Sequence, residues 1–164
     1  MKLIKIKISN FRPYAGRIEI DLSTDPSKNF TIIQGNNGTG KSNLMSAILW
    51  CMYGEPYGKS EQSSRPMWNE YMAESLKEGE SITVSVSTIW GENEPKCEIE
   101  RINTFTKEKG RFFKSGEKFI INEFSKEKGT MKLDYPGYVD KKIIPKDLVE
   151  FFFFDGEEIK SYFK

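Results

Sequence analysis

The stretch that decides the fold of this chain is Gly35-Asn36-Asn37-Gly38-Thr39-Gly40-Lys41-Ser42. It satisfies the pattern G-x-x-x-x-G-K-[ST], in which a row of backbone N–H groups curls around the phosphates of a nucleotide. Glycines are needed where a side chain would block the curl or the close approach of a phosphate. The stretch therefore predicts a phosphate-binding loop for a nucleoside triphosphate, and the expected ligand is ATP with Mg²⁺.

Each part of this loop has an expected chemical role. The backbone of residues 35–40 would hold the phosphates, helped by the positive N-terminal end of the helix that follows. Lys41 would reach the β- and γ-phosphate oxygens, which makes it the expected catalytic cation. The hydroxyl of Ser42 would bind Mg²⁺. The alternative, a chance glycine turn before a helix, is disfavoured by the sequence on either side.

The flanking sequence predicts a strand before the loop and a helix after it. Phe30-Thr31-Ile32-Ile33 is an apolar run on consecutive positions, which is typical of a strand covered on both faces. From Lys41 onward apolar residues recur at helical spacing, and Gly54 is a natural stop. We expect this helix to be central and buried because almost all of its positions are apolar.

Alternating apolar and polar residues predict an antiparallel sheet. Lys2–Ser9 and Arg17–Leu22 are expected to pair. Residues 54–80 are punctuated by proline and glycine, which indicates a long excursion with a short helix near 71–77. Further strands are predicted at 81–88, 97–105, 111–114 and 117–124, with turns near Gly110 and Ser115-Gly116. A short helix is predicted at 146–150, after Pro145.

The composition excludes several classes of function. The 164 residues carry 25 Lys and Arg against 24 Asp and Glu, so a net charge of +1 gives no overall attraction to nucleic acid or lipid. The absence of histidine removes imidazole catalysis. The longest apolar run, Ala47–Tyr53, has seven residues, so no membrane span or signal peptide is expected. With two cysteines and no disulfide framework, the expected location is cytoplasmic.

Several segments carry a family resemblance. The loop variant G-x-N-G-x-G-K-S and the segment Ile8-Ser9-Asn10-Phe11-Arg12 resemble SMC-like, ABC-type ATPase heads of chromosome maintenance and double-strand-break repair. Within that class, Asn10–Gly16, Leu49–Gly54 and Phe151–Glu157 resemble the DndD family of DNA phosphorothioation, the sulfur modification of the DNA backbone. The resemblance runs continuously over residues 1–54 and again over about 143–160.

The resemblance implies an α/β fold, the N-terminal lobe of an ABC-type P-loop ATPase head, with an antiparallel sheet beside the P-loop sheet. It divides the chain into a P-loop core at 1–54, a connecting excursion at 55–80, an antiparallel sheet at 81–124, and a helix with a metal-sensing loop at 143–164. The family's C-terminal lobe, reached through a long coiled coil, carries the signature stretch and switch histidine that this chain lacks. The implied partners are that C-terminal lobe, a second head that dimerises with ATP, DNA and other DNA-modification proteins, with no membrane.

Three further residues receive roles from the resemblance. Arg12 would lie near the α-phosphate or base of the nucleotide, the alternative being an exposed loop arginine. Asp155 falls where related heads place a metal-sensing glutamine. Alternatively, Phe151–Phe154 is a buried Walker B strand that ends in the Mg²⁺-directed Asp155, with Glu157 orienting the attacking water, although Gly156 separates the two carboxylates. A purely structural aromatic strand is the third interpretation.

Two classes of function follow. The first is an ATPase that couples ATP hydrolysis to a DNA transaction, phosphorothioation by resemblance, with a repair or SMC-like ATPase as the alternative. The second is a nucleotide-binding module without turnover. A small-molecule kinase is disfavoured, since the sequence has no lid-like arginine cluster and no succession of βαβ units.

A basic run forms a separate candidate for DNA contact. It consists of Lys107, Lys109, Arg111, Lys114 and Lys118, interleaved with Phe112 and Phe113. A DNA-facing hairpin is one interpretation. A solvated sheet edge, whose lysines discourage aggregation, is the favoured one because Glu108 and Glu117 dilute the charge.

Overall fold

The computed structural model of this chain describes residues 2–25, 27–28, 30–36, 38–55, 65–91, 96–133 and 137–153. The chain divides into two compact units, Met1–Asp134 and Tyr135–Lys164. Each unit is described by itself. No helix in the described residues is long and apolar enough to span a membrane.

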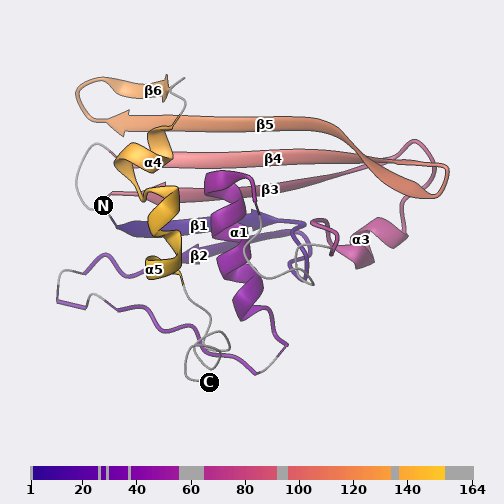
Figure 1. Cartoon of the computed structure of the whole chain (residues 1–164), viewed down its shortest axis with the longest axis horizontal. Helices are drawn as coiled ribbons and strands as arrows, with labels where there is room; N and C mark the ends of the chain where they lie inside the picture. Colours follow the sequence, from indigo (N-terminus) through magenta and orange to yellow (C-terminus); the bar gives the residue numbers. More distant parts are fainter. Residues whose placement is uncertain are drawn as a thin grey trace. The chain divides into compact units, whose positions relative to one another are not determined.

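The larger unit is built on one six-stranded sheet, in the order β2-β1-β3-β4-β5-β6, with every neighbouring pair antiparallel (Figure 1). The predicted pairing of the first two strands is confirmed, since Ile6 lies opposite Ile20 and Ile8 opposite Ile18. The sheet also joins these strands directly to the later ones. Its members are β1 (Leu3–Ser9), β2 (Arg17–Asp21), β3 (Ser81–Trp90), β4 (Lys96–Glu108), β5 (Arg111–Ser125) and β6 (Gly129–Leu133).

The two faces of the sheet differ in polarity because side chains alternate along each strand. One face carries the core and packs against helix α1, which lies across it in Figure 1. Its fully buried residues include Ile6, Val86 and Ile99. The opposite face is polar, since Lys7 lies opposite Ser87, and Ser87 opposite Glu100.

Helix α1 (Lys41–Tyr53) confirms the predicted buried helix after the loop. It ends at Gly54, whose left-handed φ of 80° lets its N–H bond the Trp50 carbonyl at 2.9 Å. The Arg101 guanidinium donates to the carbonyl of Cys51 in the last turn. That contact places a positive charge at the negative end of the helix dipole.

The strand predicted at Phe30–Ile33 is wrong for the described residues. This segment belongs to no helix or strand, and the exposed fractions are 89% for Phe30, 88% for Ile32 and 47% for Ile33. A strand covered on both faces needs neighbouring strands and a layer on each side. Within the described part of the chain, all six strands pair with one another in the antiparallel sheet, so none is left to pair with this segment.

The turn predicted at Ser115-Gly116 is also wrong, because the two strands predicted there form the single strand β5. The pairing shifts by one residue, since Gly116 lies opposite Thr104 and Lys114 opposite Phe105. Ser115 is the extra residue of a bulge, which is a common reason for a glycine inside a strand. The turn near Gly110 is confirmed. Strand β6 was not predicted, because it contains little alternation.

Residues 65–91 contain the short helix α3 (Glu70–Glu74), which begins one residue earlier and ends three earlier than predicted. Asn69 caps its N-terminus, as its side-chain oxygen accepts a hydrogen bond from the Met72 N–H at 3.0 Å. An isolated bridge between Phe11 and Trp68 brings this excursion beside the connection between β1 and β2.

The second unit contains helix α4 (Tyr138–Lys142), the 3₁₀ turn η1 (Lys146–Leu148) and helix α5 (Val149–Phe152). The predicted helix after Pro145 is confirmed, but α4 was not predicted. Phe151 is helical and 74% exposed, which contradicts the buried strand that the Walker B interpretation and the structural-strand interpretation both need at this position. The N–H of Phe153 bonds the Val149 carbonyl at 2.8 Å, so local helical bonds satisfy this backbone instead. Asp155 and Glu157 lie outside the described residues.

Candidate nucleotide-binding site

The predicted phosphate-binding loop lies directly before α1, as the mechanism requires. Gly40, the residue before the helix, has φ 103° and ψ 5°, a conformation that L-amino acids rarely adopt. Gly35 is required for a different reason, since a β-carbon there would lie 2.6 Å from the Thr39 hydroxyl oxygen. Gly38 also has a positive φ, of 81°. Asn37 lies outside the described residues.

The Lys41 side chain folds back over the loop. Its ammonium donates to the carbonyls of Gly35 and Asn36, each at 2.7 Å. The Thr39 hydroxyl donates to the same Asn36 carbonyl at 2.7 Å. An ammonium carries three donors, so this arrangement closes the loop and leaves one N–H for a phosphate oxygen. Lys41 is exposed, which keeps that donor accessible.

Tyr14 supports the end of the loop, a role that sequence reasoning missed. Its hydroxyl donates to the Gly40 carbonyl at 2.9 Å, and burial raises the pKa of this phenol. A β-carbon at Gly40 would lie 3.2 Å from the Pro13 ring. The connection between β1 and β2 therefore packs against the loop at the residue where its backbone is most constrained. No spacing in the sequence signals such a contact, because it joins segments far apart in the chain.

Arg12 is buried beside the loop, with an exposed fraction of 8%, so the interpretation as an exposed loop arginine is wrong. Its guanidinium donates to the Asn43 side chain at 3.2 Å and lies 5.5 Å from the centre of the Phe11 ring. Burial lowers the pKa of Arg12, and the nearby positive charge of Arg65 lowers it further. Its role toward the nucleotide remains a prediction.

A cavity of about 290 Å³ opens between Arg12 and the loop. We call it the Arg12 cavity. Its lining combines two guanidinium groups with a loop glycine, the amides of Asn43 and Asn69, two aromatic rings and the carboxylate of Glu70. The two guanidinium groups outnumber the one carboxylate, which suits a phosphorylated ligand. The sequence reasoning missed Arg65, since it follows a polar excursion with no recognisable pattern. The cavity is lined by Arg12, Gly38, Asn43, Arg65, Trp68 and Asn69, among other residues.

The groups near the loop fit Mg²⁺ only together with a nucleotide. Ser42 lies in the first turn of α1 and is half-buried. Among the described residues, no group of three or more His, Cys, Asp or Glu could hold a metal by itself. One hydroxyl, phosphate oxygens and waters form the kind of ligand set that Mg²⁺ takes at nucleotide sites.

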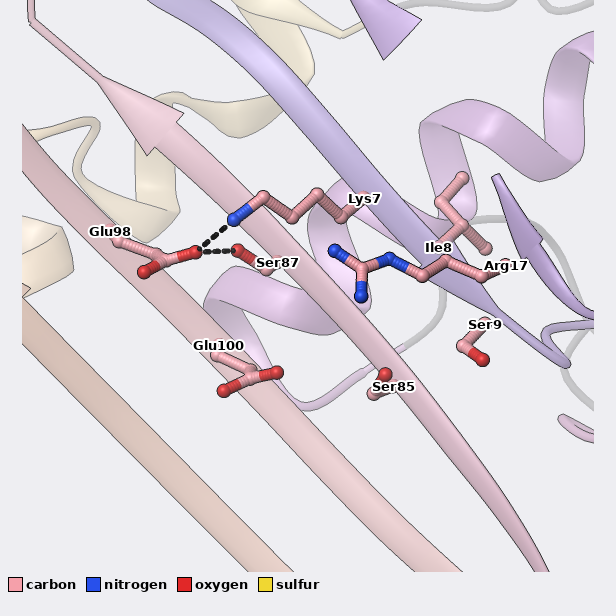
Figure 2. A pocket seen from close by; sticks show the side chains of 8 residues that line it. All are labelled: Lys7, Ile8, Ser9, Arg17, Ser85, Ser87, Glu98 and Glu100. Carbon is pink, nitrogen blue, oxygen red and sulfur yellow. Dashed lines mark hydrogen bonds and ion pairs between the residues drawn. The ribbon is translucent and has the colours of Figure 1, made fainter. Parts of the chain in front are cut away.

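A second cavity, of about 390 Å³, lies on the polar face of the sheet (Figure 2). The Lys7 ammonium lies 2.9 Å from the Glu98 carboxylate, which also accepts a hydrogen bond from Ser87 at 2.7 Å. Burial acts to raise the pKa of Glu98, but the bonds from Lys7 and Ser87 lower it overall. The pKa of Glu100 is raised by burial and by the charge of Glu98. We interpret this face as a solvated polar surface on which Lys7, Ser87 and Glu98 form one hydrogen-bonded cluster.

Several residues of the basic run on β4 and β5 make contacts within the chain. The Lys107 ammonium donates to the Leu76 carbonyl at 2.7 Å, and Lys114 pairs with Glu117. Phe112 packs against Trp68, with ring centres 5.0 Å apart. These contacts favour the interpretation of the run as a structural edge.

The fold and the loop define a P-loop ATPase domain of mixed α/β structure. The family model described as the AAA domain matches residues 5–164, so this chain belongs to the AAA domain family. A component of the SbcCD nuclease of Vibrio cholerae is similar, with 39% identity over 79 residues, which are 48% of this chain and 8% of that protein. The RecF DNA replication and repair protein of Prosthecochloris aestuarii is 41% identical over 51 residues, 31% of this chain and 12% of that protein.

The structural maintenance of chromosomes protein 1 of Arabidopsis thaliana is also similar, with 41% identity over 51 residues, 31% of this chain and 4% of that protein. The matched part thus spans only a small share of each of these relatives. The matches support the predicted resemblance to the N-terminal lobe of SMC-like, ABC-type P-loop ATPases. These matches do not show the narrower resemblance to the DndD family.

Proposed function

We propose that this chain is the ATP-binding lobe of an SMC-like ATPase that couples ATP hydrolysis to a DNA transaction. The observation that carries the proposal is the loop itself, in which Lys41 closes over the carbonyls of Gly35 and Asn36 at the N-terminus of a buried helix. Backbone N–H groups and the helix dipole would bind the phosphates, and the remaining Lys41 donor would bind the β- and γ-phosphates.

The bound metal would be held by Ser42 and the phosphates, and it would neutralise charge that develops on the γ-phosphate. The residues of the chain would orient the nucleotide around it. Arg12 would contact the α-phosphate or the base from the Arg12 cavity. Asp155 would act in metal sensing, within a lobe divided at 1–54, 55–80, 81–124 and 143–164. The water-positioning role of Glu157 depended on the Walker B strand, which the helical, exposed Phe151 contradicts.

The expected partner is the C-terminal lobe of the same ATPase. The exposed apolar side chains of Phe30, Ile32 and Ile33 support this, because such a run requires strands from elsewhere to become buried. That lobe, and a second head across the nucleotide, would supply the signature stretch and switch histidine. We therefore expect the chain alone to bind ATP and to hydrolyse it negligibly.

The DNA transaction we propose is phosphorothioate modification, as in the DndD family, together with other DNA-modification proteins. The support is the family-like sequence at Asn10–Gly16, Leu49–Gly54 and Phe151–Glu157. A double-strand-break repair or SMC-like ATPase is the alternative, favoured by relatives whose names refer to a nuclease, to DNA repair and to chromosome maintenance. A binding module without turnover is the remaining alternative.

A phosphate-release assay tests whether the chain alone lacks groups that ATP hydrolysis requires. The purified chain should release phosphate far more slowly than about one per second, which lies within the ordinary enzyme range, because each missing group typically lowers turnover about 10²- to 10³-fold. Addition of the C-terminal lobe of the same protein should raise the rate. Turnover above about one per second by the chain alone, abolished in Lys41→Ala, would show that the site is complete.

A further inference from the structure

We propose that Asn69 is a positioning residue for the nucleotide, which acts by fixing the backbone of Arg12. This inference rests on the proposed function. Asn69 contacts neither the loop nor Lys41 in any hydrogen bond of the described residues. Asn69 also lines the Arg12 cavity, but its effect would pass through Arg12, whose guanidinium lies in that cavity beside the loop.

Asn69 links two segments that are far apart in the sequence. Its side-chain amide donates to the Arg12 carbonyl at 2.6 Å, while its side-chain oxygen accepts from the Met72 N–H at 3.0 Å. Its own N–H donates to the Asn10 carbonyl at 2.8 Å, and the Arg12 N–H donates to Met67 at 2.9 Å. The side chain is buried, with 6% exposed, so both of its polar ends are satisfied by these partners.

The backbone that Asn69 holds is strained. Asn10 has φ 52° and Arg12 has φ 49°, and both therefore lie in the left-handed region. Asparagine adopts this region readily, whereas arginine does so only when its surroundings require it. Such outliers persist where neighbouring contacts over-determine them, and they cluster at functional sites. We infer that the Asn69 amide keeps Arg12 in this conformation and thereby keeps its guanidinium beside Asn43 and the loop.

Asn69 is itself mounted on a rigid support. The neighbouring Trp68 ring packs against both Phe105 and Phe112, with ring centres 4.8 and 5.0 Å apart. After α3, the Glu78 carboxylate accepts from the N–H groups of Lys109 and Gly110 at the tip of the β4–β5 hairpin, each at 2.7 Å. A positioning residue on a fixed element defines geometry better than one on a free loop.

The test is a double-mutant cycle on ATP affinity, measured by calorimetry with the parent chain, Asn69→Ser, Arg12→Ala and the double variant. Serine keeps an acceptor for the Met72 N–H but is too short to replace the bond to the Arg12 carbonyl. We expect Asn69→Ser to weaken ATP binding about 5- to 30-fold, the range of one lost interaction of this kind. In the Arg12→Ala background, Asn69→Ser should change the ATP affinity less than about twofold, because the effects of substitutions at two coupled residues do not add.

An equal loss in both backgrounds would overturn the proposal, since Asn69 would then act independently of Arg12, either on the fold or on the nucleotide directly. An unchanged affinity in Asn69→Ser would also overturn it. If the serine variant does not fold, as judged by circular dichroism, Asn69→Thr takes its place, because it keeps a capping oxygen and removes the amide donor without adding a charge. Lys41→Ala distinguishes a failure of the Asn69 proposal from a failure of the proposed ATP-binding function. Binding that depends on Lys41 but not on Asn69 refutes this proposal alone, whereas no binding by the parent chain refutes both.

Discussion

Gly40→Ala is the substitution whose cost follows most directly from the structure. The residue has φ 103°, and an added β-carbon would lie 3.2 Å from the Pro13 ring and 3.4 Å from the Tyr14 hydroxyl. Two separate penalties are expected. One is the left-handed backbone, and the other is the crowding against Pro13 and Tyr14.

The magnitudes can be estimated separately. A left-handed conformation costs an L-residue roughly 1–2 kcal/mol. Crowding a packed position with one more carbon costs roughly 1–3 kcal/mol. The sum, about 2–5 kcal/mol, corresponds to a fall in the thermal midpoint of about 4–20 °C for a chain of this size.

Gly79→Ala is the matched control, since Gly79 has φ 83° and nothing within 4 Å of its added β-carbon. It should show only the backbone cost, about 1–2 kcal/mol. Thermal unfolding followed by circular dichroism compares the two variants. Equal midpoints would refute the packing of Pro13 and Tyr14 against the loop, and a parent-like midpoint for Gly40→Ala would refute the assigned backbone conformation as well.

Three further results are expected. Tyr14→Phe should lower the free energy of unfolding by about 0.5–1.5 kcal/mol in urea titrations, because it removes the bond to the Gly40 carbonyl; no change would contradict that contact. Ser42→Ala should lose the Mg²⁺ dependence of ATP binding more than the affinity itself, and identical parent curves with and without Mg²⁺ would argue against this role. Burial raises the pKa of Cys51 from 9.0 to about 12, so the thiol stays neutral in the folded chain while the unfolded chain ionises. Between about pH 9 and pH 12, the unfolding free energy should therefore fall by up to about 1.4 kcal/mol per pH unit relative to Cys51→Ala; parallel pH profiles of the two proteins would contradict it.

The sequence predicted most of the fold wherever a local period governs the structure. The alternation in Lys2–Ser9 and the helical rows after Lys41 became β1 and α1, because each pattern matches one face of the element it forms. The same reasoning failed at Phe30–Ile33, where a strand depends on neighbours that are not in the described residues. It failed again at Ser115-Gly116, since a bulge and a turn favour the same residue types.

The sequence predicted the phosphate-binding loop of the candidate site, but it did not predict the residues that pack around this loop. The glycines and Lys41 follow a pattern that the phosphate chemistry imposes on consecutive positions. Tyr14, Arg65 and Asn69 come to the site only through tertiary contacts, and their spacing in the chain reflects the length of the intervening loops. The backbone of Arg12 likewise bonds Met67 and Asn69, which lie more than 50 residues away in the sequence.

Calorimetric titration of ATP with Mg²⁺ into the parent chain and into Lys41→Ala tests whether Gly35–Ser42 binds the phosphates of ATP. We expect saturable binding by the parent and a severe loss in the variant, since Lys41 is the loop's one side-chain cation while the core lies elsewhere. Circular dichroism should show that the variant remains folded. An unchanged affinity in a folded Lys41→Ala chain would contradict the account.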